Sequence, residues 1–131
     1  MVRDYEALHA YLASHMRTPF AWDGHCCVIH AADAVLAQTG VDKLAAYRGR
    51  WRTAIEAVRL LDDLGGMEVA VNSVLAAVAP SMAQRGDVAG WLDANGRLQL
   101  AIVEGETIVG PGLDGQERLP RSAMVRAWSA V

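Results

Sequence analysis

The chain changes character near residue 85. Residues 1–84 are rich in alanine and leucine and carry apolar residues at helical spacing, whereas residues 85–120 are rich in glycine and alternate between apolar and polar side chains. Helices followed by an antiparallel meander are the layout of an α+β domain. With 131 residues, 53% of them hydrophobic, the chain has the size of one domain and can bury a core without disulfides or metals. We therefore predict a single α+β domain over residues 1–131.

Helices are expected throughout the first part. Proline disfavours helix at the residue before it, and glycine is a common helix stop, so Pro19, Gly40 and Pro80 mark boundaries. Thr53 is a good N-cap, and a Gly-Gly pair ends the helix that it starts. Together these signals predict helices over residues 4–16, 26–40, 53–64 and 67–78.

The second part reads as a meander of strands. Asn95-Gly96 is a strong hairpin signal between two alternating segments. In the second of these segments, Leu98, Leu100 and Ile102 fall on one face. The pattern predicts strands over residues 88–92, 98–103, 107–109 and 116–119. A closing helix is expected over residues 122–128.

Composition excludes several classes of function. The net charge is −3 and the lysines and arginines are scattered, so we expect no nucleic-acid partner. No apolar run approaches the roughly 20 residues that span a bilayer. The acidic N-terminal segment lacks the apolar region of a signal peptide, so we expect synthesis in the cytoplasm without export by the general route. Gly110-Pro111-Gly112 lacks the lysine and the following helix of a phosphate loop, and we expect no cofactor.

The two cysteines, Cys26 and Cys27, are adjacent and stand where a loop becomes a helix. Neighbouring cysteines rarely bond to each other, so both are expected to be thiols. A helix start favours the thiolate and so suits a nucleophile, although a buried cysteine is as often a small apolar filler. His25 and His30 add two more potential metal ligands, but adjacent cysteines point apart and no second ligand pair exists elsewhere. We therefore predict no metal site.

The order of these motifs resembles that of the NlpC-like, papain-type cysteine peptidases, in which an aromatic loop precedes Asp-Cys, a helix ending in glycine, and Gly-Asp before a hairpin. The resemblance covers nearly the whole chain. It is greatest to small NlpC-like proteins encoded beside tail-tip genes of long-tailed phages, whose motif is Trp-Gly-x-x-Asp-Cys. It implies a papain-like domain with N-terminal helices packed on a small antiparallel sheet. The matching elements are Phe20-Ala21-Trp22, Cys26-Cys27, Gly40, Gly86-Asp87, residues 47–54 and residues 119–128.

The resemblance places Cys27 on the nucleophile of the family, with Cys26 in place of its aspartate and Asp23 in place of its glycine. It places Gln99 where the family has the histidine that acts as general base. Glutamine cannot accept and return a proton near neutral pH. No histidine follows His30 in the chain.

The remaining histidines offer only limited replacements for the missing general base. His30 lies three residues after Cys27 and shares a helix face with it, while His25 suits a loop or capping position. Either is an alternative base. His9 and His15 are expected at the surface or rim of the first helix.

Two functions follow as hypotheses. The first is a structural or accessory component of a phage or prophage tail tip, built on a catalytically degenerate domain, located in the virion tail and bound to tail hub or tip proteins. Trp51, Trp91 and Trp128 are candidate anchors, although core packing is favoured for Trp22 and Trp128. The alternative is an active cysteine peptidoglycan hydrolase that helps to penetrate the cell wall. A host toxin, immunity or adaptor domain is a third interpretation.

Overall fold

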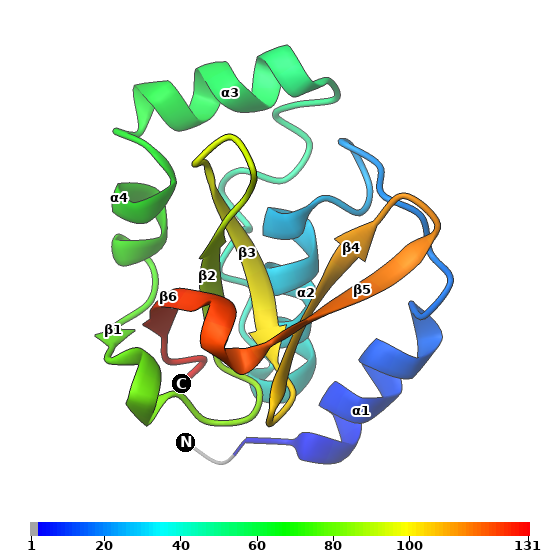
Figure 1. The fold of residues 1–131 in the computed structure, drawn as a ribbon. Coiled ribbons are helices and arrows are strands. Elements are labelled where there is room, and N and C mark those ends of the chain that lie inside the picture. Colours follow the sequence, from blue (N-terminus) through cyan, green and yellow to red (C-terminus); the bar gives the residue numbers. More distant parts are fainter. Residues whose placement is uncertain (1–2) are drawn as a thin grey trace.

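The structure is a computed structural model that describes residues 3–131. Helices come first in the chain and an antiparallel sheet follows, so the predicted α+β class is confirmed (Figure 1). The described helices are α1 (Tyr5–Ser14), α2 (Cys27–Thr39), α3 (Ala54–Asp63) and α4 (Met67–Asn72), with short 3-10 helices η1 (Pro80–Met82) and η2 (Arg121–Ala123). The strands are β1 (Ala77–Val78), β2 (Val88–Leu92), β3 (Leu98–Val103), β4 (Thr107–Gly112), β5 (Gly115–Pro120) and β6 (Met124–Trp128).

The strands form one six-stranded sheet in the order β1-β6-β2-β3-β4-β5, and the pairs are antiparallel. Strands β2 and β3 form the predicted hairpin, with Val88 opposite Ile102 and Trp91 opposite Gln99. Gly96 in its turn has a φ of 74°, which glycine adopts without strain. Strands β4 and β5 form a second hairpin beside it (Figure 1).

The two faces of the sheet have separate cores. Side chains alternate along β3, so Leu100 and Ile102 pack with α1 and α2, as the sequence predicts. Ala101 and Val103 point the other way and pack in the second core. The face toward α2 is therefore the one on which a helix-borne cysteine can meet the sheet.

Strand β6 occupies residues for which the sequence predicts a closing helix, and this prediction is wrong. The segment pairs with β2, placing Trp128 opposite Val88. Trp128 is almost fully buried, and its indole N–H donates to Asn72 at 2.7 Å. Pairing with a central strand thus outweighs the helical spacing that residues 122–128 also satisfy.

The fourth predicted helix is also too long. Helix α4 ends at Asn72, and the chain then continues as β1, in which Ala77 pairs with Trp128. The same edge of the sheet therefore explains both errors, because β1 adds to β6 only when β6 is a strand.

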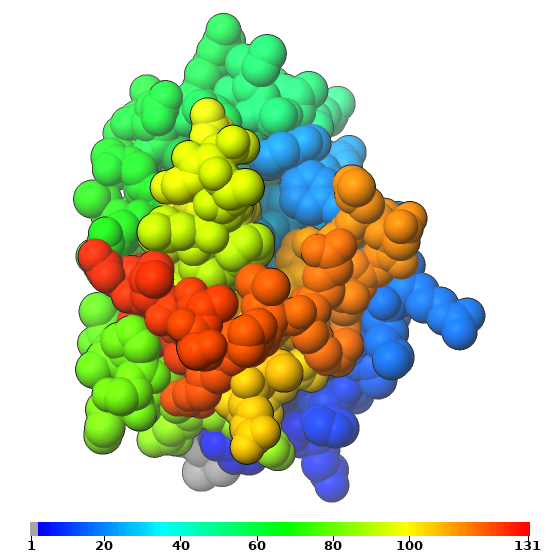
Figure 2. Space-filling view, viewed as in Figure 1, coloured from blue at the N-terminus to red at the C-terminus, as the bar shows by residue number. Residues whose placement is uncertain are grey.

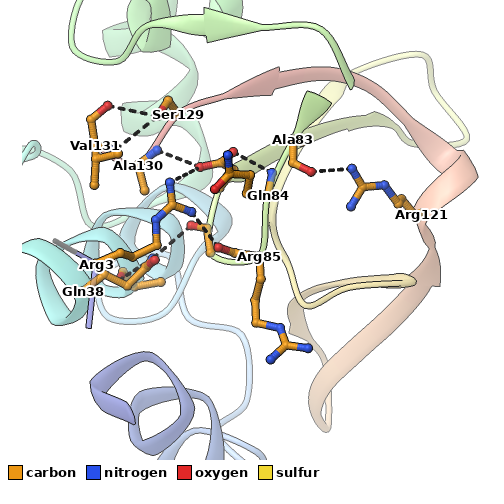
Figure 3. Close-up of polar contacts among 12 residues, drawn as sticks. Arg3, Gln38, Ala83, Gln84, Arg85, Arg121, Ser129, Ala130 and Val131 are labelled. Carbon is orange, nitrogen blue, oxygen red and sulfur yellow. Dashed lines mark hydrogen bonds and ion pairs between the residues drawn. The ribbon is translucent and has the colours of Figure 1, made fainter. Parts of the chain in front are cut away.

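A buried polar cluster joins the start of the chain, the end of α2 and the C-terminal segment (Figure 3). Arg3 forms an ion pair with Asp87 at 2.9 Å, and both side chains are less than a tenth exposed. Asp87 also accepts hydrogen bonds from the backbone N–H groups of Gln84 and Ala130. Gly86-Asp87 therefore forms a strand-entry turn that ties distant segments together.

Within residues 3–131, no helix is both long enough and apolar enough to cross a membrane.

Candidate functional site

Cys27 is the first residue of α2, as the sequence predicts, and Cys26 is its N-cap. Cys26 has extended backbone angles and makes no side-chain capping bond. The segment before α2 reaches the surface between the β2–β3 hairpin, drawn in yellow, and the β4–β5 hairpin, drawn in orange (Figure 2). Cys27 itself is half-buried, and its side chain packs against the core that contains Leu98 and Leu100 of β3.

The surroundings of Cys27 disfavour its thiolate form. Burial raises the pKa of Cys27 to about 12, and the backbone N–H groups of Leu100 and Val28 offset only part of that increase. Desolvation therefore outweighs the favourable field of the helix start. The pKa of Cys26 is raised by burial as well. Burial thus disfavours the thiolate at both cysteines.

Gln99 lies on the opposite face of the sheet from Cys27. It stands opposite Trp91, which packs with the second core, and its amide donates to Asp93 Oδ2 at 3.0 Å. The expectation that Gln99 faces Cys27 is therefore not met. The residues that β3 directs toward the cysteine are Leu98 and Leu100, which carry no proton donor or acceptor in their side chains.

Three histidines form a row beside this core. The rings of His15 and His25 are stacked at 5.2 Å, and His25 meets His30 edge-on at 5.4 Å. Tyr11 lies against both His15 and His30, with ring centroids at 4.5 and 5.6 Å. The prediction of a surface or rim position for His15 therefore misses this cluster. The four-residue spacing of Tyr11 and His15 could have indicated that their rings meet, because it places both on one side of the C-terminal end of α1.

The His30 side chain is fully buried in the core, and both of its ring nitrogens form hydrogen bonds there. Its Nε2 lies 3.1 Å from the carbonyl oxygen of Val109, so this nitrogen carries the proton, and Nδ1 accepts from the Tyr11 hydroxyl at 3.0 Å. Burial lowers the pKa of His30 to about 4, and the neighbouring His25 and His15 add to that decrease. Both ring nitrogens are occupied, which leaves none to take a proton from Cys27.

Of the two buried histidines in residues 3–131, His25 is the one with an unpartnered ring nitrogen. It is buried, and its Nε2 has no hydrogen-bond partner among residues 3–131. Burial is the main cause that lowers its pKa, followed by the charge of His15. Its ring is held in the histidine row, and neither cysteine forms a hydrogen bond with a histidine in the described part of the chain.

The tryptophans are not all where the sequence predicts. Trp128 is in the core as expected, whereas Trp22, also predicted to be buried, is 40% exposed. Trp51, a candidate surface anchor, is 7% exposed, and its indole N–H donates to the carbonyl oxygen of Trp22 at 2.7 Å. Residues 3–131 hold no group of three or more His, Cys, Asp or Glu side chains placed to bind a metal ion.

Comparison with solved structures connects this geometry to a known fold. The crystal structure of the NlpC/p60 domain of the peptidoglycan hydrolase SagA superposes with a TM-score of 0.61, covering 96% of this chain and 98% of that chain at 20% identity. The chain therefore has the NlpC-type, papain-like fold. No curated protein matches it. A sequence profile described as "Domain of unknown function (DUF6950)" matches residues 2–130, and the chain belongs to that family.

Proposed function

We propose that this chain is a non-hydrolytic NlpC-type domain that serves as a structural or accessory component of a phage or prophage tail tip. One observation carries the loss of hydrolysis: the Cys27 side chain packs against the apolar core that contains Leu100 of β3, where a papain-type site needs a base. The raised pKa of Cys27 agrees with this interpretation. Gln99 lies on the other face of the sheet and takes no part in this packing.

The tail-tip role is supported by the sequence resemblance of residues 47–54 and 119–128 to the phage-associated NlpC-like group. On this proposal the domain is located in the virion tail and binds tail hub or tip proteins. Mass spectrometry of purified tail particles from a phage that encodes the chain tests it. We expect the protein in stoichiometric amounts with the tip proteins, and its absence from intact tails would overturn the assignment.

Digestion of peptidoglycan tests the catalytic part of the proposal. Purified wild-type protein and Cys27→Ala are each incubated with cell-wall sacculi, and released muropeptides are measured by chromatography. We expect no release above buffer from either protein. Cys26→Ala is the matched control for loss of a neighbouring thiol. Release by the wild type that Cys27→Ala abolishes and Cys26→Ala retains would establish a hydrolase instead.

The competing function, cysteine-dependent hydrolysis with His25 as base, has one favourable observation: the unpartnered Nε2 of that residue. It requires the His25 ring to leave its stack on His15 and approach Cys27. If the wild type does release muropeptides, His25→Gln separates this route from one through His30, because only the former loses activity in that variant.

A further inference from the structure

An apolar cavity of about 120 Å³ lies between the start of α2, the loop that follows α2, and the pair α3 and α4. Its walls are almost entirely carbon atoms. They include Trp22 and Cys26 before α2, Trp51 in the following loop, and Leu60 and Val71 from the two later helices. This cavity is separate from the contact of Cys27 with β3.

The cavity stays open because α3 covers it without packing down onto it. Helix α3 has no fully buried residue, and its Leu60 and Leu61 are only half-buried although they line the space. The helix crosses one end of the molecule, away from the sheet (Figure 1). Trp51 fixes the chain before it through the 2.7 Å bond to Trp22, and Gly65-Gly66, with φ values of 92° and 101°, turns the chain after it. The path of α3 is therefore set by Trp51 before the helix and by the Gly65-Gly66 turn after it, and the space beneath the helix is only partly filled by side chains.

One cation stands at the rim. Lys43 lines the cavity, is exposed, and forms no ion pair within residues 3–131. Lys43 contributes carbon atoms to the lining, so a ligand whose apolar part enters the cavity can leave an anionic group at the rim beside this residue. The exposed Trp22 side chain offers a further apolar surface at the cavity.

We propose that this cavity binds a small amphiphilic carboxylate, with its alkyl or aromatic part inside and its carboxylate toward Lys43. An engineered apolar cavity of about 150 Å³ stays dry and binds benzene, so a space of this size accepts one ring or a chain of about six carbons. The absence of polar lining atoms selects against a polar occupant, because a buried polar group without a partner is unfavourable. The inference does not depend on the loss of hydrolysis at Cys27.

A series of straight-chain carboxylates tests the proposal. Butyrate, hexanoate, octanoate and decanoate are titrated into the wild-type protein while the indole and methionine methyl signals are followed by NMR. Affinity should rise about fourfold for each carbon added up to about six carbons, and then level off as the cavity fills. Shifts should concentrate at Trp22, Trp51 and Met67. Absence of binding, or affinity independent of chain length, would overturn the proposal.

Variants test the cavity and the cation separately. Ala57→Leu and Ala70→Leu each fill the cavity from one of the covering helices, and at least one folded variant should lower hexanoate affinity tenfold or more. Ala45→Leu, an exposed position outside the lining, is the matched control and should change nothing. If both filled variants fold, as judged by circular dichroism, and still bind as the wild type does, the cavity is not the site.

Lys43→Gln should weaken hexanoate binding by up to about fivefold, the range of an exposed ion pair, and leave hexanamide binding unchanged. Arg59→Gln on α3 removes an exposed cation that does not line the cavity and should change neither ligand. Equal affinity of the wild type for hexanoate and hexanamide would contradict the anionic part of the proposal.

Discussion

The two ends of helix α2 differ in how their buried polar groups are paired. At the C-terminal end, the Gln38 amide donates to the carbonyl oxygens of Ala34 and Gly86, beside the ion pair of Arg3 and Asp87. At the N-terminal end, the Cys27 side chain packs against the core to which Leu100 of β3 belongs. The end that ties segments of the fold together is rich in polar side-chain contacts, whereas at the other end the Cys27 thiol forms no hydrogen bond with a side chain of the sheet within residues 3–131.

The difference shows which constraints the fold itself imposes. Asp87 receives an arginine and two backbone N–H groups; the contact with Gln84 is local, whereas those with Arg3 and Ala130 join it to the two ends of the chain. Removing one member would leave the others buried without partners. No comparable network depends on Cys27, so its neighbours on β3 can be apolar without loss of the fold. Measurements at each end of α2 test this contrast.

The largest effect is expected from Asp87→Ala. The substitution leaves Arg3 buried without its partner and removes the acceptor for two backbone N–H groups. Breaking a buried pair in this way costs about 3–5 kcal/mol. Urea denaturation followed by circular dichroism measures the loss. Asp114→Ala, at an exposed position whose side chain forms no hydrogen bond or ion pair with residues 3–131, is the control and should change the free energy of unfolding by less than about 0.5 kcal/mol. Equal effects of the two substitutions would remove the contrast between the ends of α2.

A somewhat smaller effect is expected from acid, through His30. Its folded pKa of about 4 lies below the ordinary 6.5, so the unfolded chain takes up a proton that the folded chain does not. Stability is therefore fully present above pH 6.5 and is lost as the pH falls toward 4. At about 1.4 kcal/mol for each pKa unit, the loss is roughly 3 kcal/mol. Unfolding free energies measured at several pH values between 7 and 4 give the slope of stability against pH.

Substitutions show whether His30 causes this dependence of stability on pH. His30→Gln cannot titrate, so its stability should depend less on pH across this window even if the variant is weaker at pH 7. His9→Gln, at an exposed position of α1, should retain the wild-type slope. A wild-type slope in His30→Gln would mean that the acid sensitivity arises elsewhere, and would leave the histidine row without a role in it.

The order of elements could be predicted from the sequence because its signals are local. Asn95-Gly96 and the alternation around it specify a hairpin, and Gly40 ends α2 as expected. Strand β6 could not be recognised in this way, because its pairing with β2 joins residues about 40 positions apart along the chain. The histidine row likewise depends on how α1 packs beside α2, which single-helix spacing does not reveal.

The placement of Gln99 shows a second limit of prediction from the sequence. The alternation that puts Leu98, Leu100 and Ile102 on one face also requires Gln99 to point to the other. Alignment with the family position by position does not take that requirement into account. A shift of one residue along a strand moves a side chain to the other face of the sheet. The pattern within the strand was the better guide to the residue that meets Cys27.

The smallest expected effect tests that conclusion directly. Leu98→His places an imidazole on the face of β3 that packs against Cys27, near the end of the hairpin where the leucine is only half-buried. A nearby histidine favours the thiolate, so alkylation of Cys27 by iodoacetamide at pH 7 should become about tenfold faster than in the wild type, which corresponds to about one pKa unit. Gln99→His introduces the same ring on the opposite face and should leave the rate unchanged. Both rates are read by mass spectrometry of the peptide that contains Cys27, in a Cys26→Ala background. If Gln99→His accelerates the reaction and Leu98→His does not, the face assignment of β3 is wrong and Gln99 regains the place of the missing base.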